Sequence, residues 1–263
     1  MMQFNVKAFF TEHAVLMANT RRAVLVGLAA LAIAIAPAIH YGKSAPAAPL
    51  QQPVAAFPLP VRFAYFGNAT PSPDARHLAD WVADSRDNAK TDFVIIDKVQ
   101  ARVYVFDADA WLRGDAPVLL GSARGDDTVP GIGTRPLADV LPQERTTPAG
   151  RFIAERGINT LGEDVVWVDY DAAVSMHRVR VTQPKERRLQ RLATLTATDN
   201  RISYGCINVP VDFYNAYIQP TFAARKAVVY VLPELKSMEQ VFGAYDVAKL
   251  NRPPAQPAAL GGG

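Results

Sequence analysis

The chain has 263 residues, of which 49% are hydrophobic and 20% are charged, and it contains a single cysteine. This length accommodates one large or two small domains, and the hydrophobic content suffices for a packed core, which excludes an intrinsically disordered protein. Residues 1–43 hold four of the 28 basic and one of the 25 acidic residues, so residues 44–263 carry 24 of each. A neutral body lacks the concentrated positive charge that nucleic-acid binding needs, so no nucleic-acid partner is predicted.

Residues 1–43 have the features of an export signal. An uncharged apolar run over residues 23–39 follows a pair of arginines and ends in an A-x-A arrangement of small residues. The run is short for a membrane span of about 20 residues, and Pro37 interrupts it. The pattern predicts either a cleaved secretory signal or an N-terminal membrane anchor, and it places the body in the periplasm or cell envelope.

The body is predicted to be mainly β, with few helices. Residues 44–90 combine an Ala/Pro-rich linker with a helix over residues 73–88, where a proline start precedes apolar residues at helical spacing. A domain is predicted over residues 91–234, followed by a C-terminal helix and disordered tail over residues 235–263. Within that domain, strands are predicted where runs of Val, Ile, Tyr and Phe are bounded by Gly, Pro and Asp: residues 93–97, 101–106, 116–121, 150–155, 164–170, 173–181 and 226–232.

The only cysteine, Cys206, lies in the stretch RISYGCINVP. Cysteines of exported proteins usually pair as disulfides, so a single one is either an inert buried side chain or a thiol retained for chemistry. A thiol attacks an amide only as thiolate, which a nearby base, cation or aligned N–H group favours. Gly205 permits a sharp turn, and the backbone amides of such a turn can form an oxyanion hole. This context favours Cys206 as a nucleophile.

A nucleophilic thiol needs a base, and the sequence offers few. Tyr204, two positions before Cys206, carries a phenol, and phenols are protonated at neutral pH and donate hydrogen bonds. His177 is predicted as the base because the remaining histidines lie in or beside the leader or in the predicted N-terminal helix: His13, His40 and His77. The alternative for His177 is a strand histidine satisfied by a backbone carbonyl.

The pattern around Cys206 resembles the signature of the L,D-transpeptidase (YkuD-like) catalytic domain, in which a histidine and a variable gap precede [Ser/Thr]-His-Gly-Cys-apolar-[Asn/Arg]. The matching residues are Ser203, Gly205, Cys206, Ile207 and Asn208, with His177 as the earlier histidine. Residues 146–152 (TTPAGRF) and 92–110 resemble the family's Thr-Pro-x-Gly-x-Phe segment and opening hairpin, so the resemblance covers residues 92–233. Two features differ: Tyr204 replaces the motif histidine, and 25 residues, including an insertion-like stretch over 182–200, separate His177 from Ser203.

The resemblance implies a β-sandwich catalytic domain that acts on peptidoglycan stem peptides and takes part in cell-wall biogenesis and cell shape. It implies a catalytic set of Cys206, His177, Gly205 and Tyr204, with Ser203 and Asn208 orienting the loop or the substrate. Cys206 would release a terminal D-alanine and hold the stem as a thioester for transfer to an amine. Two alternatives remain: an L,D-carboxypeptidase that uses the same thiol, and a degenerate binding or scaffold protein of the envelope, which Tyr204 favours.

Other charged stretches are given simpler interpretations. Thioester chemistry needs no cofactor, and none is predicted. Asp126 and Asp127 resemble turn aspartates, so no metal is predicted. The basic stretch over residues 178–191 is interpreted as a solvated helix face, with contact to stem carboxylates as the alternative.

Overall fold

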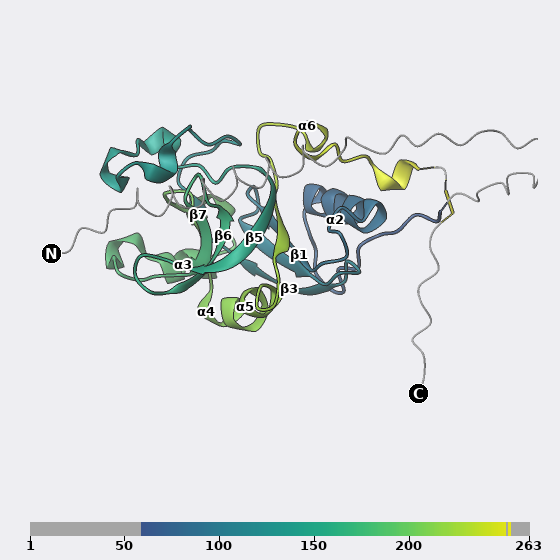
Figure 1. Cartoon of the computed structure of the whole chain (residues 1–263), viewed down its shortest axis with the longest axis horizontal. Helices are drawn as coiled ribbons and strands as arrows, with labels where there is room; N and C mark the ends of the chain where they lie inside the picture. Colours follow the sequence, from purple (N-terminus) through teal and green to yellow (C-terminus); the bar gives the residue numbers. More distant parts are fainter. Residues whose placement is uncertain (1–58, 251, 254–263) are drawn as a thin grey trace, which may run out of the picture. The chain divides into compact units, whose positions relative to one another are not determined.

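The computed structural model describes residues 59–250 and 252–253, which belong to a compact unit that begins at Ala56. Eight strands form one mixed sheet in the order β3-β2-β1-β10-β5-β6-β7-β9, and β4 and β8 form a short parallel ladder (Figure 1). The strands are β1 Phe93–Asp97, β2 Arg102–Phe106, β3 Leu112–Pro117, β4 Leu120–Gly121, β5 Gly150–Ile158, β6 Asp164–Asp169, β7 Val174–Arg178, β8 Arg201–Ser203, β9 Ile207–Val209 and β10 Ala227–Val231.

The central strands β1 and β10 separate two hydrophobic cores. Their sequences, FVIID and AVVYV, are buried at every position, as expected for strands covered on both faces. Alternation of side chains along β1 sends Val94 and Ile96 into one core and Phe93 and Ile95 into the other. The two strands run parallel, with Phe93 opposite Val228.

The sheet curls until its two edges nearly meet. Just after β3, Leu119 forms an antiparallel bridge with Asn208 on β9, with reciprocal N–H···O distances of 2.9 and 2.8 Å. The fold is mainly β with few helices, as predicted, and one curved sheet supplies the layers of the expected sandwich. The strands predicted from apolar runs are observed, except that residues 116–121 are divided between the end of β3 and β4.

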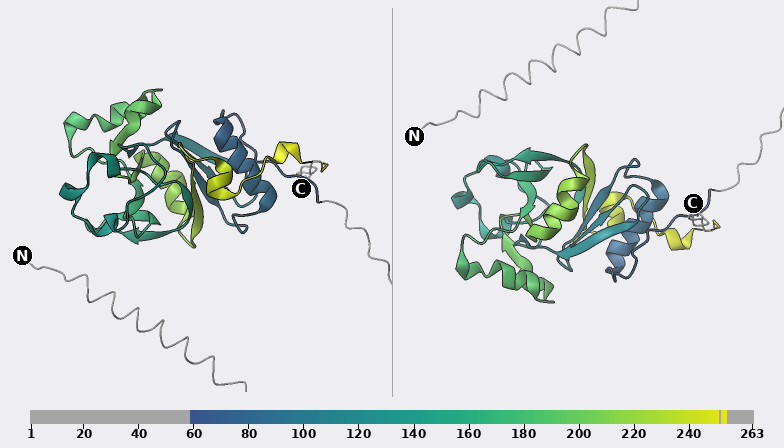
Figure 2. Two further views of the ribbon diagram at one scale, coloured as in Figure 1. Left: turned by 90° about the horizontal axis from the view of Figure 1, so that it is seen from above. Right: turned by 90° about the horizontal axis from the view of Figure 1, so that it is seen from below.

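The longest described helix, α2 (Pro73–Ser85), packs against β1 (Figure 2). Ser72 caps it by accepting a hydrogen bond from the Ala75 N–H at 3.1 Å, and Leu78 and Val82 are buried. The helix begins where predicted and ends three residues before the expected boundary, because Arg86 adopts a left-handed conformation at the C-cap.

Short helical segments make the remaining connections. They are α3 Arg188–Ala193, α4 Val211–Phe213, α5 Gln219–Thr221, α6 Met238–Phe242, the π-helical η6 Tyr214–Ile218, and the 3₁₀ segments η1 Ile132–Thr134, η2 Leu137–Asp139, η3 Pro142–Glu144, η4 Pro184–Glu186, η5 Ala197–Asn200 and η7 Val247–Lys249. Within α6, Met238 joins the same buried cluster as α2, so residues from both ends of the described chain cover the face of the sheet on which Phe93 lies.

The predicted leader, and the linker as far as residue 58, lie outside the described residues. Among the helices that the structure describes, none combines the length and the apolar character needed to cross a bilayer. The predicted division into a leader, a linker with its helix, a catalytic domain and a tail stays a prediction.

Candidate active site

Parallel pairing of β7 with β9 brings His177 beside the Cys206 loop. The register sets Met176 opposite Ile207 and His177 opposite Asn208. Met176 and Ile207 are fully buried in the core. Because successive side chains of a strand point to opposite faces, Ser175 and His177 on β7 share the other face with Asn208 and, just before β9, Cys206. Residues that are 29 positions apart in the sequence thus meet at one edge of the sheet.

The thiol of Cys206 is partly buried and has polar neighbours on β7 and just before it. Its Sγ atom lies 3.6 Å from the hydroxyl of Ser175 and 3.6 Å from the carbonyl oxygen of Ala173. Burial raises the pKa of the Cys206 thiol, but the hydrogen bond and charge of His177, together with hydrogen bonds from Ser175, outweigh it. The pKa of Cys206 is therefore below its ordinary value, which favours the thiolate.

The imidazole of His177 is oriented by its own strand. Its Nδ1 atom lies 2.8 Å from the carbonyl oxygen of Arg178. A carbonyl only accepts hydrogen bonds, so Nδ1 carries the proton and the neutral ring keeps its lone pair on Nε2. The backbone-carbonyl contact considered as the structural alternative is thus present, and it sets the tautomer that a general base requires.

Gly205 adopts a backbone conformation that only glycine accepts readily, with φ = +130°. A Cβ atom there would lie 2.7 Å from the carbonyl oxygen of Thr146, too close for any side chain. The Gly205 N–H donates to the Ser203 hydroxyl at 3.1 Å. Of the Gly205 and Cys206 amides, that of Cys206 is the one without a partner among the described residues, so it is the candidate oxyanion donor.

The carbonyl groups of the loop are also fixed by side chains. Ser203 donates to the Cys206 carbonyl at 2.6 Å, and the Asn208 amide donates to the same oxygen at 3.2 Å. Asn208 is in turn held by Arg188, whose Nη1 lies 2.5 Å from its Oδ1. Ser203 and Asn208 are 4% and 1% exposed. These contacts support a positioning role for both residues, and contact with a substrate stays a prediction.

Arg188 belongs to the stretch interpreted as a solvated helix face. That interpretation is wrong for three of its arginines: Arg178 lies on β7 and donates to Asp164 and Asn215, while Arg188 and Arg191 point back into the protein. Arg188 holds Asn208, and Arg191 donates to the carbonyl oxygens of Glu186, at 2.7 Å, and Asp199. The insertion-like segment therefore braces the loop that carries Cys206.

Tyr204 lies on the outer side of the loop and is 43% exposed. The guanidinium of Arg145 stacks over its ring, with the Arg145 Cζ atom 4.1 Å from the ring centroid. The structure shows no hydrogen bond from the Tyr204 hydroxyl to another described residue. Participation of Tyr204 in catalysis stays a prediction, whereas Arg145 is a neighbour that the sequence motif did not indicate.

A cluster of four buried charges lies beneath the loop. Lys98 donates to Asp126 at 2.7 Å and to the carbonyl oxygen of Thr147 at 3.1 Å, while Arg201 pairs with Glu234 at 2.7 Å. Lys98 Nζ also lies 3.7 Å from Glu234, which joins the two pairs. The Thr147 hydroxyl donates to the carbonyl oxygen of Gly205 at 2.8 Å. Thr147 therefore links the charge cluster directly to the residue beside Cys206.

Asp126 is consequently a core residue, and its interpretation as a turn aspartate is wrong. It is 4% exposed and accepts backbone N–H bonds from three residues of the segment after β10: Glu234, Leu235 and Lys236, at 2.8, 2.8 and 2.7 Å. Burial alone raises the pKa of Asp126, but the Lys98 ammonium and these N–H groups hold it at about 2. Burial lowers the pKa of Lys98.

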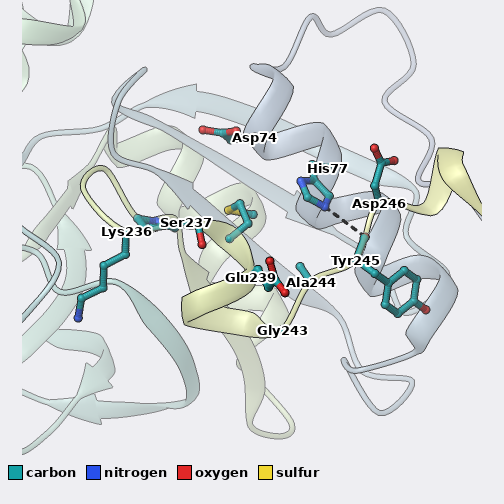
Figure 3. Close-up of a pocket in the computed structure, with 11 residues that line it drawn as sticks. Asp74, His77, Lys236, Ser237, Glu239, Gly243, Ala244, Tyr245 and Asp246 are labelled. Atoms are coloured by element: carbon teal, nitrogen blue, oxygen red, sulfur yellow. Dashed lines mark hydrogen bonds between the residues drawn. The ribbon is translucent and has the colours of Figure 1, made fainter.

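A cavity of about 590 Å³ lies apart from the thiol, between α2 and the C-terminal segment (Figure 3). It is lined by residues that include His77, Glu239 and Asp246, and it shares no residue with the Cys206 loop. His77 Nε2 lies 3.2 Å from the carbonyl oxygen of Tyr245. His77 is thus engaged elsewhere. Within residues 59–250 and 252–253, no group of three or more His, Cys, Asp or Glu side chains could hold a metal ion.

Comparisons with known proteins found no matching family model and no matching curated protein. Solved structures do match. They include the catalytic domain of an L,D-transpeptidase from Enterococcus faecium, with 15% identity and a TM-score of 0.30, covering 54% of this chain and 98% of that one. The cell-shape-determining protein Pgp2 from Campylobacter jejuni matches with 15% identity and a TM-score of 0.36, and the L,D-transpeptidase LdtMt1, solved with imipenem, with 14% and 0.32.

The match to Pgp2 covers 61% of this chain and 57% of the Pgp2 chain, and the match to LdtMt1 covers 54% and 59%. This chain therefore spans less than two thirds of either protein. These structures are what the chain is similar to, at 14–15% identity and TM-scores of 0.30 to 0.36. Roles of individual residues rest on the geometry of the site.

Proposed function

We propose that this chain is an exported cysteine acyltransferase of the L,D-transpeptidase type, which acts on peptidoglycan stem peptides through Cys206. The observation that carries the proposal is the β7–β9 register, which places His177 beside the loop of Cys206. The Nδ1 proton of His177 is committed to the Arg178 carbonyl, and the pKa of the Cys206 thiol lies below its ordinary value despite burial. A structural cysteine requires neither an oriented imidazole nor a backbone turn restricted to glycine.

The geometry supports a two-step reaction. In the first step His177 Nε2 takes the thiol proton, and the Cys206 sulfur attacks the carbonyl carbon that precedes the terminal D-alanine of a stem. Negative charge on the carbonyl oxygen would be met by the Cys206 N–H. The imidazolium then returns the proton to the departing D-alanine nitrogen as the C–N bond breaks, leaving a thioester on Cys206.

The second step transfers the acyl group to an acceptor. An amine attacks the thioester carbonyl, His177 takes the proton of the amine, and the thiolate leaves. The new C–N bond completes a transpeptidation, with no net change in oxidation state and no cofactor. If water attacks instead, the product is a shortened stem and the protein is an L,D-carboxypeptidase. Export by the segment over residues 1–43 belongs to the same proposal, because stems of this kind lie outside the cytoplasmic membrane.

The second candidate is an envelope-binding or scaffold protein that does not turn over. Tyr204 favours it, since the phenol lies where the family motif has a histidine and is stacked beneath Arg145. Such a protein would keep the fold and bind the envelope while Cys206 stays unacylated.

Mass spectrometry of the intact protein separates these candidates. Cys206 is the only cysteine, so incubation with a carbapenem or a stem tetrapeptide should add one acyl group to the parent protein and none to Cys206→Ala. Formation of an amide between the shortened stem and an added amine supports transpeptidation, and formation of the free shortened stem without an amine supports the carboxypeptidase. Absence of any adduct on the folded parent protein would overturn the enzyme proposal and favour the scaffold.

A further inference from the structure

Arg145 presents an unused cationic edge at the rim of the Cys206 site. Its Nε and Nη2 atoms both face the carbonyl oxygen of Val140, at 3.4 and 3.2 Å, and its planar group rests on the Tyr204 ring. A guanidinium has five N–H donors in a fixed fork. The two N–H groups on the Nη1–Nη2 edge therefore remain for another acceptor, and the carbonyl and the ring hold that edge in place.

The charge of Arg145 has no acidic partner among residues 59–250 and 252–253. Its neighbours differ: Arg135 pairs with Glu144 at 2.7 Å, and Arg201 pairs with Glu234 at 2.7 Å. Half-buried cations are ordinarily paired, because desolvation without compensation is costly. A preorganised and unpaired guanidinium is the arrangement by which proteins recognise a carboxylate through two parallel hydrogen bonds.

The segment carrying Arg145 runs directly along the thiol loop. Arg145 covers Tyr204, the carbonyl oxygen of Thr146 would be 2.7 Å from a Cβ atom on Gly205, and the Thr147 hydroxyl donates to the Gly205 carbonyl at 2.8 Å. Three consecutive residues thus contact the two that precede Cys206. Residues 145–147 therefore form one side of the loop that presents the thiol.

We infer that Arg145 is a carboxylate-binding residue of the Cys206 site, which selects acyl donors bearing a carboxylate close to the reacting carbon. The stem peptide as the source of that carboxylate rests on the proposed function. The preference for an anion does not, and it can be measured on the thiol alone. Tyr204 serves in this arrangement as the platform that aims the guanidinium.

The test compares two alkylating reagents of nearly equal size, iodoacetate, which carries a carboxylate, and iodoacetamide, which is neutral. Both react with the only cysteine, and intact-mass spectrometry gives the two rates. We expect Arg145→Gln to lower the iodoacetate-to-iodoacetamide rate ratio about fivefold, in the range for a partly exposed charge-assisted pair. Arg145→Lys should recover part of the ratio, because the charge returns without the fork. High salt should reduce the ratio of the parent toward that of Arg145→Gln.

Arg86→Gln is the matched control, since it removes an exposed positive charge at the C-cap of α2. Helix α2 packs in the hydrophobic core that contains Phe93, away from the Cys206 loop. Arg86→Gln should leave the ratio unchanged. A ratio insensitive to Arg145→Gln in a protein with a parent-like circular dichroism spectrum would overturn the inference, as would an equal fall with Arg86→Gln. A preserved anion preference without any acyl adduct would overturn the proposed function alone, and an acyl adduct without anion preference would overturn this inference alone.

Discussion

The two sides of the Cys206 loop are built in contrasting ways. Beneath it lies the charge cluster of Lys98, Asp126, Arg201 and Glu234, whose side chains are at most 11% exposed and fully engaged. Above it lie Tyr204 and Arg145, which are accessible and hold each other mainly by a stacked contact. Rigidity beneath the loop fixes the backbone that presents the thiol, while the accessible rim is left to meet a ligand. Changes beneath should therefore act on stability, and changes above on chemistry.

The largest effect is expected from Asp126→Asn. Removing one charge of a buried pair deprives the Lys98 ammonium of its nearest carboxylate, and such changes cost about 3–5 kcal/mol of unfolding free energy. Urea denaturation measures this loss. The matched control is the adjacent Asp127→Asn, whose side chain is 75% exposed and pairs with Lys236 at the surface. It should cost no more than about 1 kcal/mol. Equal losses of unfolding free energy in the two variants would show that the buried charge of Asp126 matters no more than the exposed charge of Asp127.

His177→Ala tests the chemical side of the contrast. Loss of the imidazole removes the base and the interaction that lowers the pKa of Cys206, so acylation should slow by about 10²-fold or more, as for other general bases. The inflection in the pH profile of iodoacetamide alkylation should move to higher pH, since burial alone raises the pKa of the thiol. His77→Ala, which changes a histidine in the separate cavity, should alter neither measurement. If the inflection of the alkylation profile stays at the same pH in His177→Ala, His177 has only a structural role.

The pH dependence of stability provides a further check on the buried cluster. The pKa of Asp126 is about 2 in the folded protein, below its ordinary value of 3.8. A depressed carboxyl pKa contributes stability that is complete above 3.8 and is lost as the pH falls from there through about 2. The difference in unfolding free energy between the parent and Asp126→Asn should therefore shrink over this window. A difference that stays constant from pH 5 to pH 2 would contradict an ionised Asp126 in the folded state.

Gly205 lies in the loop between the buried charge cluster and the accessible rim of Tyr204 and Arg145, and Gly205→Ala should affect both stability and chemistry. The methyl group would meet the Thr146 carbonyl in a backbone conformation that alanine rarely adopts, at a cost of about 1–3 kcal/mol. Because the clash lies beside the thiol, both stability and the acylation rate should fall. The control Gly162→Ala also has a positive φ but has no atom within 4 Å of the new methyl group, so it should reduce stability less and leave acylation unchanged. Parent-like acylation by Gly205→Ala would show that this turn does not position the thiol.

Much of the fold was predictable because it depends on local patterns. The apolar runs of β1 and β10 and the proline start of α2 are visible in single segments. The site depends instead on pairing between distant segments. β9 has only three residues and is not distinguished by its sequence, yet its parallel register with β7 is what places His177 at the loop.

The charges that support the loop were also hidden from sequence reasoning. Lys98 and Asp126 lie in DKVQ and GDDT, whose composition is that of exposed turns. Only the fold shows that they are buried together. Arg145 directly precedes the TTPAGRF segment that resembles the family's, and that adjacency was the one available signal for it.

The smallest effect, on the acylation rate, is expected from Tyr204→Phe. This variant tests most sharply whether the rim formed by Tyr204 and Arg145 binds ligand or takes part in catalysis. Stacking with Arg145 uses the face of the ring, which phenylalanine retains, so acylation should stay within about twofold of the parent. Tyr204→Leu removes the ring and should lower the iodoacetate-to-iodoacetamide ratio toward that of Arg145→Gln, with little change in unfolding free energy. Timed mass spectrometry of the Cys206 adduct distinguishes the variants. Loss of acylation in Tyr204→Phe would mean that the hydroxyl itself takes part in the reaction, and that the rim is part of the catalytic machinery as well as a ligand-binding edge.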